Sequence, residues 1–145
     1  MISTALAREL RDAGLVWTPA SGDAFQIVPD NENSADFEGD VFTVSDMTIE
    51  AHVYSTGTVL GFNGTTVWAL DSVALDDALW LPREDQLRDL LRGAFQSMRR
   101  DTAEARVSYS VLARIDREDA AFLADDPAEA YGLALLALIR SVRAA

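Results

Sequence analysis

The sequence lacks cysteine and lysine altogether and contains a single histidine, His52. Without cysteine, the chain cannot form disulfides, thiolate zinc sites or cysteine nucleophiles. Without lysine, it cannot supply the lysine of a phosphate-binding loop, and neither G-x-x-x-x-G-K-[ST] nor G-x-G-x-x-G occurs. These absences argue against nucleotide hydrolysis. A histidine-rich zinc site is excluded because His52 stands alone.

Positive charge is also scarce, and all of it is arginine: 12 arginines accompany 24 aspartates and glutamates, for a formal net charge of −12. A field of this sign repels phosphate backbones and anionic lipids, so we expect no nucleic-acid or membrane binding. The partner we expect is a protein that is basic or disordered. No signal peptide is visible, and the longest apolar run, residues 133–139, is shorter than the ~20 residues that span a bilayer. The sequence therefore predicts a soluble cytoplasmic protein.

Length and patterning predict one α+β domain over residues 1–145. The chain is 49% hydrophobic and 25% charged, which is typical of a globular domain with its own core. We expect an antiparallel β-meander of about five or six strands, packed by an N-terminal, a central and a C-terminal helix. Ser3 suits the cap of the first helix and Gly14 its end.

Short β-branched and aromatic runs separated by turn residues predict the strands. The connections are too short for crossover helices, so the sheet is expected to be antiparallel, with Asn63-Gly64 as a hairpin turn. The expected elements are a hairpin over 15–28, strands over 41–45, 49–54, 59–62, 66–70 and 106–114, and a short helical turn over 120–123.

The central and C-terminal helices are predicted from apolar spacing. Residues 82–98 carry a stripe at helical intervals, with Pro82 suited to the first turn. The last helix begins at Asp126-Pro127 and is apolar nearly all round, so it must be covered on more than one side. Either a sheet and another helix cover it, or a second copy of the protein does, and our first interpretation is a homodimer through this helix and a sheet face. The stripe of the central helix consists of Leu87, Leu90, Leu91, Ala94, Phe95 and Met98.

The candidate site residues are aromatic, lie on the wetter face of a strand, or belong to the last helix. Aromatic side chains can line a pocket or a partner groove, although most of those in a small domain form its core. For His52, the position on the wetter face of a strand favours an ordinary surface residue. No catalytic, cofactor-binding or metal-binding residue is assigned, and no cofactor is expected. The candidate interaction or pocket residues are Trp80, Trp68, Tyr54, His52, Leu135 and Ile139.

The abundant carboxylates allow two further hypotheses. In the acidic loop 29–40, alternating oxygen ligands are compatible with calcium, but no glycine stands at the required turn, which favours a solvated loop. Asp46, Asp71 and Asp77 come from distant stretches and could together bind Mg²⁺ or perform acid–base chemistry. In a chain with 24 acids, however, neighbouring carboxylates also arise by chance, which weakens the case for such a site.

Three stretches resemble one family. Residues 41–50, 62–73 and 79–87 resemble small actinobacterial proteins, some of which carry the label "pilus assembly protein CpaE". The resemblance covers most of residues 1–98 and implies an actinobacterial cytoplasmic protein. It carries over no functional residues.

Three functional hypotheses follow. The first is a non-enzymatic protein-interaction or adaptor domain. The second is a chaperone for secreted clients, by analogy with small acidic proteins that have a helix at each end and an antiparallel sheet. The third is a small-molecule enzyme that uses carboxylates, which requires convergent acids in a concave site.

Overall fold

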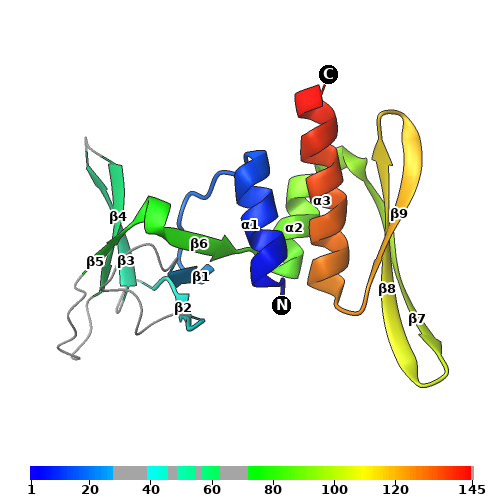
Figure 1. The fold of residues 1–145 in the computed structure, drawn as a ribbon, viewed down its shortest axis with the longest axis horizontal. Helices are drawn as coiled ribbons and strands as arrows, with labels where there is room; N and C mark the ends of the chain where they lie inside the picture. Colours follow the sequence, from blue (N-terminus) through cyan, green and yellow to red (C-terminus); the bar gives the residue numbers. More distant parts are fainter. Residues whose placement is uncertain (28–38, 46–48, 55–56, 63–71, 145) are drawn as a thin grey trace. The chain divides into compact units, whose positions relative to one another are not determined.

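The structure, a computed structural model, describes residues 1–27, 39–45, 49–54, 57–62 and 72–144. Within these residues, three α-helices accompany nine strands in three antiparallel sheets, which confirms the α+β class (Figure 1). Contacts group the chain into two compact units, Met1–Val16 with Pro82–Ala145, and Trp17–Leu81. The single domain expected over residues 1–145 stays a prediction.

The two units divide the charged residues unequally. All 12 arginines lie in the first unit, together with 13 aspartates and glutamates, while the second holds the other 11 acids and no arginine. The side-chain charge is therefore −1 in the first, which we call the mixed-charge unit, and −11 in the second, the acidic unit. The charge of the chain thus comes almost wholly from residues 17–81.

The first helix forms as predicted. The Ser3 hydroxyl oxygen accepts a hydrogen bond from the Leu6 N–H at 3.2 Å, which caps the amino end. Gly14 ends the helix with φ of +117°, a conformation that side chains with a Cβ rarely adopt.

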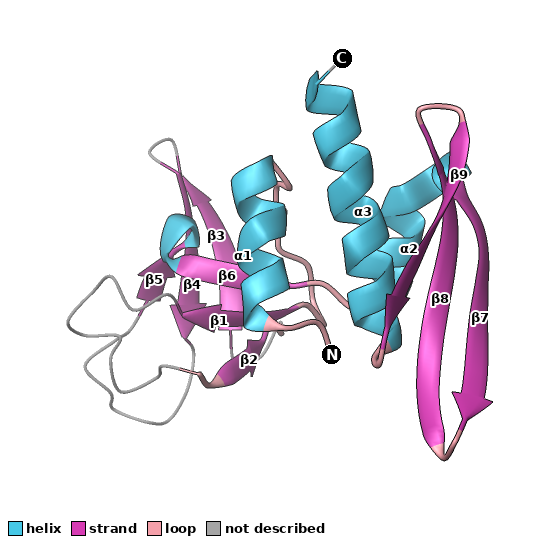
Figure 2. Ribbon diagram, turned by 45° about the vertical axis from the view of Figure 1, so that its right-hand side comes forward, coloured by secondary structure: helices cyan, strands magenta, loops and turns pink. Residues whose placement is uncertain are grey.

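This helix, α1 (Thr4–Ala13), lies beside the C-terminal helix, α3 (Pro127–Ala144), in both views (Figures 1 and 2). At one end of the pair, the α-amino group of Met1 lies 2.8 Å from the Asp126 carboxylate. At the other end, the Arg143 guanidinium donates a hydrogen bond to the Ala13 carbonyl. The two helices therefore run in the same direction, joined at both ends.

Gly132 permits the close approach of α1 and α3. A Cβ atom at this position would lie 2.7 Å from Leu6 Cδ2 and 3.2 Å from Ile2 Cδ1. Both of these side chains are buried, so neither can move freely away.

The other face of α3 packs on a three-stranded sheet, as Figure 2 shows. The strand order of this sheet is β7 (Phe95–Ala103), β8 (Arg106–Ile115) and β9 (Glu118–Ala124). Val111 and Ala113 on the central strand are fully buried. The rings of Phe95 and Tyr131 join the sheet to the helix at a centroid distance of 5.7 Å. α3 is thus covered on more than one side, as its apolar sequence requires.

Two tight turns connect this sheet without glycine. Glu104 and Ala105 have φ of +51° and +62°, and Asp116 and Arg117 have φ of +52° and +70°. Positive φ at both central residues is the mark of a type I′ hairpin turn. The helical turn predicted over 120–123 is wrong, because pairing with β8 overrides the helix propensity of its alanines.

The central helix is shorter than predicted. α2 ends at Leu91, Arg92 has φ of +50°, and a strand begins at Phe95. The apolar stripe is compatible with a helix and with a strand, because Phe95 and Met98 also pair with residues of the neighbouring strand β8. Gly93 lowers the helix propensity at the point where the chain changes from helix to strand.

The acidic unit contains two sheets, of order β2-β1-β6 and β3-β4-β5. The hairpin predicted over 15–28 is wrong: β1 pairs with β2 and β6, and residues 15–23 form no strand. The expected strand over 66–70 and the Asn63-Gly64 turn lie outside the described residues. A cluster of Trp17, Phe25, Ile27, Val44 and Ala78 forms a core in this unit.

Other strand predictions agree closely with the structure, most exactly at residues 49–54. Among the helices described, none is long and apolar enough to cross a membrane. In chain order the elements are α1 (Thr4–Ala13), β1 (Ala24–Ile27), β2 (Val41–Thr43), β3 (Ile49–Tyr54), β4 (Gly57–Phe62), β5 (Ser72–Ala74), the 3-10 helix η2 (Leu75–Asp77), β6 (Ala78–Leu81), α2 (Glu84–Leu91), the 3-10 helix η3 (Arg92–Ala94), β7 (Phe95–Ala103), β8 (Arg106–Ile115), β9 (Glu118–Ala124) and α3 (Pro127–Ala144).

Candidate interaction groove

An open groove of about 590 Å³ lies in the mixed-charge unit, where the end of α1, the end of α2 and the last turns of α3 meet. Two of the residues predicted for interaction, Leu135 and Ile139, line it. We call this feature the aliphatic groove. Its lining residues are Ala13, Gly14, Leu15, Val16, Leu90, Leu135, Leu138, Ile139, Val142 and Arg143.

The lining of the aliphatic groove resembles the interior of a protein, although the groove is open. Leu135 is buried at its base and Ile139 is half-buried. At its margin, Val142 is 68% exposed and Val16 is 79% exposed. Arg143 is the charged member of the lining, and its guanidinium already bonds to the Ala13 carbonyl. The groove therefore offers aliphatic surface with little capacity for hydrogen bonding.

Sequence reasoning missed part of this lining. Leu90 belonged to the predicted helical stripe, so its burial against a neighbour was expected but its place in a groove was not. Leu15 and Val16 were assigned to a hairpin that does not form. The signal that could have placed them is Gly14, which ends α1 in a left-handed conformation and lines the groove together with them.

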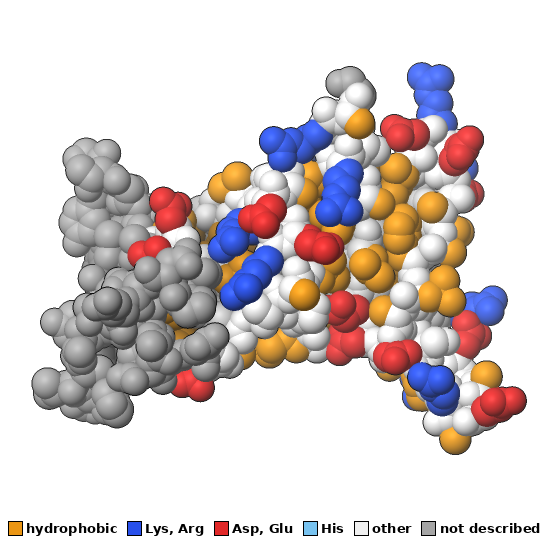
Figure 3. Space-filling view, in the orientation of Figure 1, with side chains coloured by type: hydrophobic (Ala, Val, Ile, Leu, Met, Phe, Trp, Pro, Cys, Tyr) orange, Lys and Arg blue, Asp and Glu red, His pale blue; other side chains and the backbone are white. Residues whose placement is uncertain are grey.

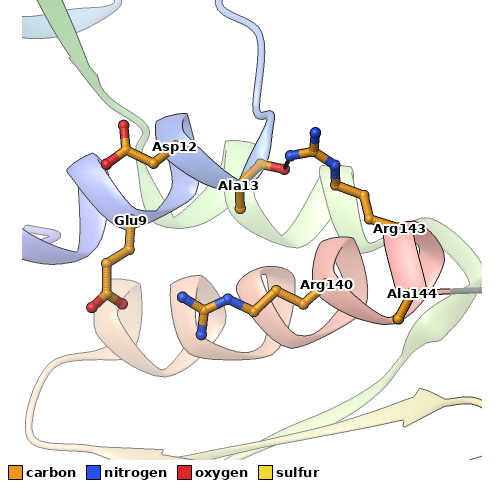
Figure 4. A pocket seen from close by; sticks show the side chains of 6 residues that line it. All are labelled: Glu9, Asp12, Ala13, Arg140, Arg143 and Ala144. Carbon is orange, nitrogen blue, oxygen red and sulfur yellow. Dashed lines mark hydrogen bonds between the residues drawn. The ribbon is translucent and has the colours of Figure 1, made fainter.

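A second hollow, of about 500 Å³, has a different chemistry (Figure 4). Glu9 and Asp12 from α1 and Arg140 and Arg143 from α3 line it, as Figure 4 shows. In the part of the chain that the structure describes, no ion pair joins Glu9 to Arg140. The charges of the two acids cancel those of the two arginines, so this hollow favours neither an anion nor a cation.

Trp80, one of the aromatic residues singled out from the sequence, packs against another tryptophan in the acidic unit. Its ring stacks on Trp17 at a centroid distance of 6.3 Å and an angle of 8°. The Trp17 Nε1 donates to Asp23 at 2.9 Å, whereas the buried Trp80 Nε1 has no hydrogen-bond partner. Trp80 therefore contributes to the aromatic core, and its role in a pocket stays a prediction.

Most of the remaining candidates from the sequence lie outside the described residues. Trp68, Asp46, Asp71 and most of the loop 29–40 lie outside the described residues, and so do the side chains of His52 and Tyr54 on β3. Asp77 is half-buried in η2. Among the residues that the structure describes, no group of three or more histidines and acids is placed to hold a metal ion. The carboxylate-enzyme hypothesis stays a prediction.

Asp126 is the acid whose environment is most clearly organised. Burial, the largest contribution, raises its pKa, but hydrogen bonds from the α-amino group and from the Glu129 and Ala128 N–H groups outweigh burial. The pKa of Asp126 therefore lies below its ordinary value of 3.8. These bonds identify Asp126 as the cap of α3, as its place before Pro127 predicted.

On the face drawn in Figure 3, charges of both signs are interspersed over α1 and α3, while hydrophobic side chains gather over α3 and β9. On β8, the Arg114 guanidinium bonds to the Asp119 carboxylate at 3.0 Å. This bond and the charge of Asp119 raise the pKa of Arg114 above its ordinary value. Such ion pairs satisfy charged side chains within the mixed-charge unit, whereas its exposed apolar side chains remain in contact with water.

No known family model, curated protein or solved structure matches the chain. Membership of the actinobacterial family that the sequence resembles therefore stays a prediction.

Proposed function

We propose that this protein is a non-enzymatic protein-interaction domain whose aliphatic groove receives an apolar segment of a partner protein. The observation that carries the proposal is the lining, in which core-like side chains remain open to solvent. Covering apolar surface is favourable by about 25 cal/mol per Å². Val16 and Val142, the most exposed of these side chains, gain most from a partner.

The lining also favours binding over bond-making. Acid–base and nucleophilic catalysis need a group that exchanges a proton or attacks a substrate near neutral pH. Arg143, the charged lining residue, already donates a hydrogen bond to the Ala13 carbonyl, and a guanidinium offers hydrogen-bond donors but no acceptor. An apolar helix face, with anchors at intervals of three and four residues, is a form of partner that suits a groove between helices. The homodimer expected from the sequence is one arrangement of this kind.

Site-specific photo-crosslinking tests this function. A benzophenone amino acid placed at Val142, in cells that naturally make the protein, is expected to form a discrete protein adduct. The control position is Glu104, which is also exposed in the mixed-charge unit but stands at a hairpin turn. The mass of the adduct distinguishes a second copy of the chain from a different protein.

A second substitution makes the test specific to the groove. Ile139→Glu places a carboxylate in the lining, and burying it unpaired is expected to reduce the adduct about tenfold or more. Circular dichroism at 222 nm checks that the helices persist. The proposal is wrong if positions 142 and 104 give the same adducts, or if the adduct survives Ile139→Glu in a folded protein.

A further inference from the structure

The two edges of the sheet β7-β8-β9 are protected to different degrees. On β7 the register shifts near the start of the strand, and residues 99–101 are the charged run Arg-Arg-Asp. Bulges and charges of this kind keep edge strands from pairing with other chains. On β9 the register with β8 is continuous, and residues 120–124 contain no charge, bulge or proline. β9 is therefore the unprotected edge.

Hairpin geometry directs alternate backbone groups of β9 away from β8. Because the connecting turn has two residues, Ile115 and Glu118 form the closing hydrogen-bonded pair. The N–H and C=O groups of Asp119, Ala121 and Leu123 consequently point outward. In the part of the chain described, no other segment forms a backbone hydrogen bond with them. These outward N–H and C=O groups can therefore form the hydrogen bonds of a β-ladder with one further strand.

The side chains along this edge indicate which partner fits. Leu123 is 63% exposed and Ala121 is also exposed, which gives the edge an apolar centre. Glu118 stands at one end and Asp125 just beyond the other, about 23 Å away at the usual rise of a strand. Both acids are exposed, and neither has an ion-pair partner among the described residues. The edge is thus apolar in the middle and negative at both ends.

We propose that β9 binds, by strand addition, an extended peptide segment of another protein that has about five apolar or neutral residues between basic ends. Outward N–H and C=O groups supply the ladder, and Glu118 and Asp125 pair with the basic ends. A second copy fits this edge less well, because its own β9 carries acids at both ends. The β9 edge shares no residue with the aliphatic groove, so either proposal can fail alone.

A labelled peptide tests the assignment. The probe is fluorescein-Arg-Arg-Val-Thr-Val-Thr-Val-Arg-Arg, titrated with the full chain at low ionic strength and followed by fluorescence anisotropy. We expect saturable binding that weakens about tenfold or more when glutamate replaces the arginines. A peptide N-methylated at alternate residues cannot complete the ladder and is expected to bind at least about tenfold more weakly.

Two proline variants locate the site on the protein. Ala121→Pro removes an outward N–H but no bond to β8, and proline is tolerated on such edges. The matched control, Thr102→Pro, removes an outward N–H from β7. We expect Ala121→Pro to abolish binding and Thr102→Pro to leave it unchanged. Loss of binding in both variants, while both remain folded, would overturn the proposal.

A charge variant decides the matter if Ala121→Pro does not fold. The double variant Glu118→Gln, Asp125→Asn keeps the shape of the edge and is expected to weaken the probe about tenfold and reduce its salt dependence. Unchanged affinity in this variant, or equal affinity for the N-methylated peptide, would overturn the proposal, as would the absence of binding to the wild-type chain.

Discussion

The mixed-charge unit and the acidic unit build their stability from different materials. The first packs aliphatic side chains of three helices against a sheet and intersperses arginines with acids. The second packs tryptophan and phenylalanine rings and contains no arginine, so its 11 acids have no fixed cation among them. Like charges oppose compactness, and salt screens them. The overall charge of −12 is therefore a property of one region, and the surfaces proposed for binding lie in the other.

The same division supplies two independent probes. All three tryptophans, Trp17, Trp68 and Trp80, belong to the acidic unit, whereas the α-helices that the structure describes belong to the mixed-charge unit. Tryptophan emission and the circular dichroism signal at 222 nm can therefore follow the two units separately during unfolding in urea. The predictions below use both signals.

The largest effect is expected from Gly132→Val. The new side chain would overlap Leu6 and Ile2 and force α1 away from α3, at a cost of about 3 kcal/mol. The midpoint at 222 nm is expected to fall, while that of tryptophan emission stays in place. Gly93→Val is the control, because a Cβ at Gly93 meets nothing within 4 Å. Equal shifts of both signals would show that the units unfold together.

Asp23→Ala is expected to have the next largest effect, in the opposite unit. The Asp23 carboxylate accepts hydrogen bonds from the Trp17 Nε1 at 2.9 Å and from the Ala20 N–H at 3.0 Å. Leaving these donors unsatisfied in a buried site costs about 2 kcal/mol, which the midpoint of tryptophan emission measures. Asp40→Ala removes an exposed acid from the same unit and should leave that midpoint unchanged. A shift confined to 222 nm would contradict the expectation.

Asp126→Ala is expected to cost about 1 kcal/mol at pH 7, through loss of the cap of α3. Because the folded pKa of Asp126 is depressed, its contribution is present above 3.8 and is lost as the pH falls through the folded pKa. The stability difference from wild type at 222 nm should therefore shrink below pH 3.8. The neighbouring exposed acid gives the control Asp125→Ala, and a difference independent of pH would contradict the prediction.

Local signals predicted both ends of the first helix, the start of the last helix and the strand over residues 49–54. Ser3, Gly14 and Asp126 act within one turn of their own positions, so their roles can be read without tertiary contacts. The positive φ values of the two glycine-free turns could not be found in this way, because Glu104-Ala105 and Asp116-Arg117 lack the usual sequence signal for this conformation. Because the hairpin geometry at Asp116-Arg117 was not recognised, residues 120–123 were predicted as a short helical turn, and the edge that we propose for peptide binding was missed.

The aliphatic groove was foreseen in part. The apolar character of α3 singled out Leu135 and Ile139, but a helix that is apolar on most sides does not indicate which side remains uncovered. The side of α3 that remains uncovered depends on where α1 and α2 end, and therefore on Gly14 and on the change from helix to strand after Leu91.

By itself, the sequence determined the α+β class, the first and last helices, the absence of cysteine and lysine chemistry, and the excess of acid. These properties depend on composition and on neighbours within a few residues along the chain. The tertiary structure decided which strands pair, where the central helix gives way to β7, and how the arginines gather in one unit. The physical reason is that pairing and burial join residues distant in sequence, and their free energy outweighs the weak local preferences of segments such as residues 95–98 and 120–123.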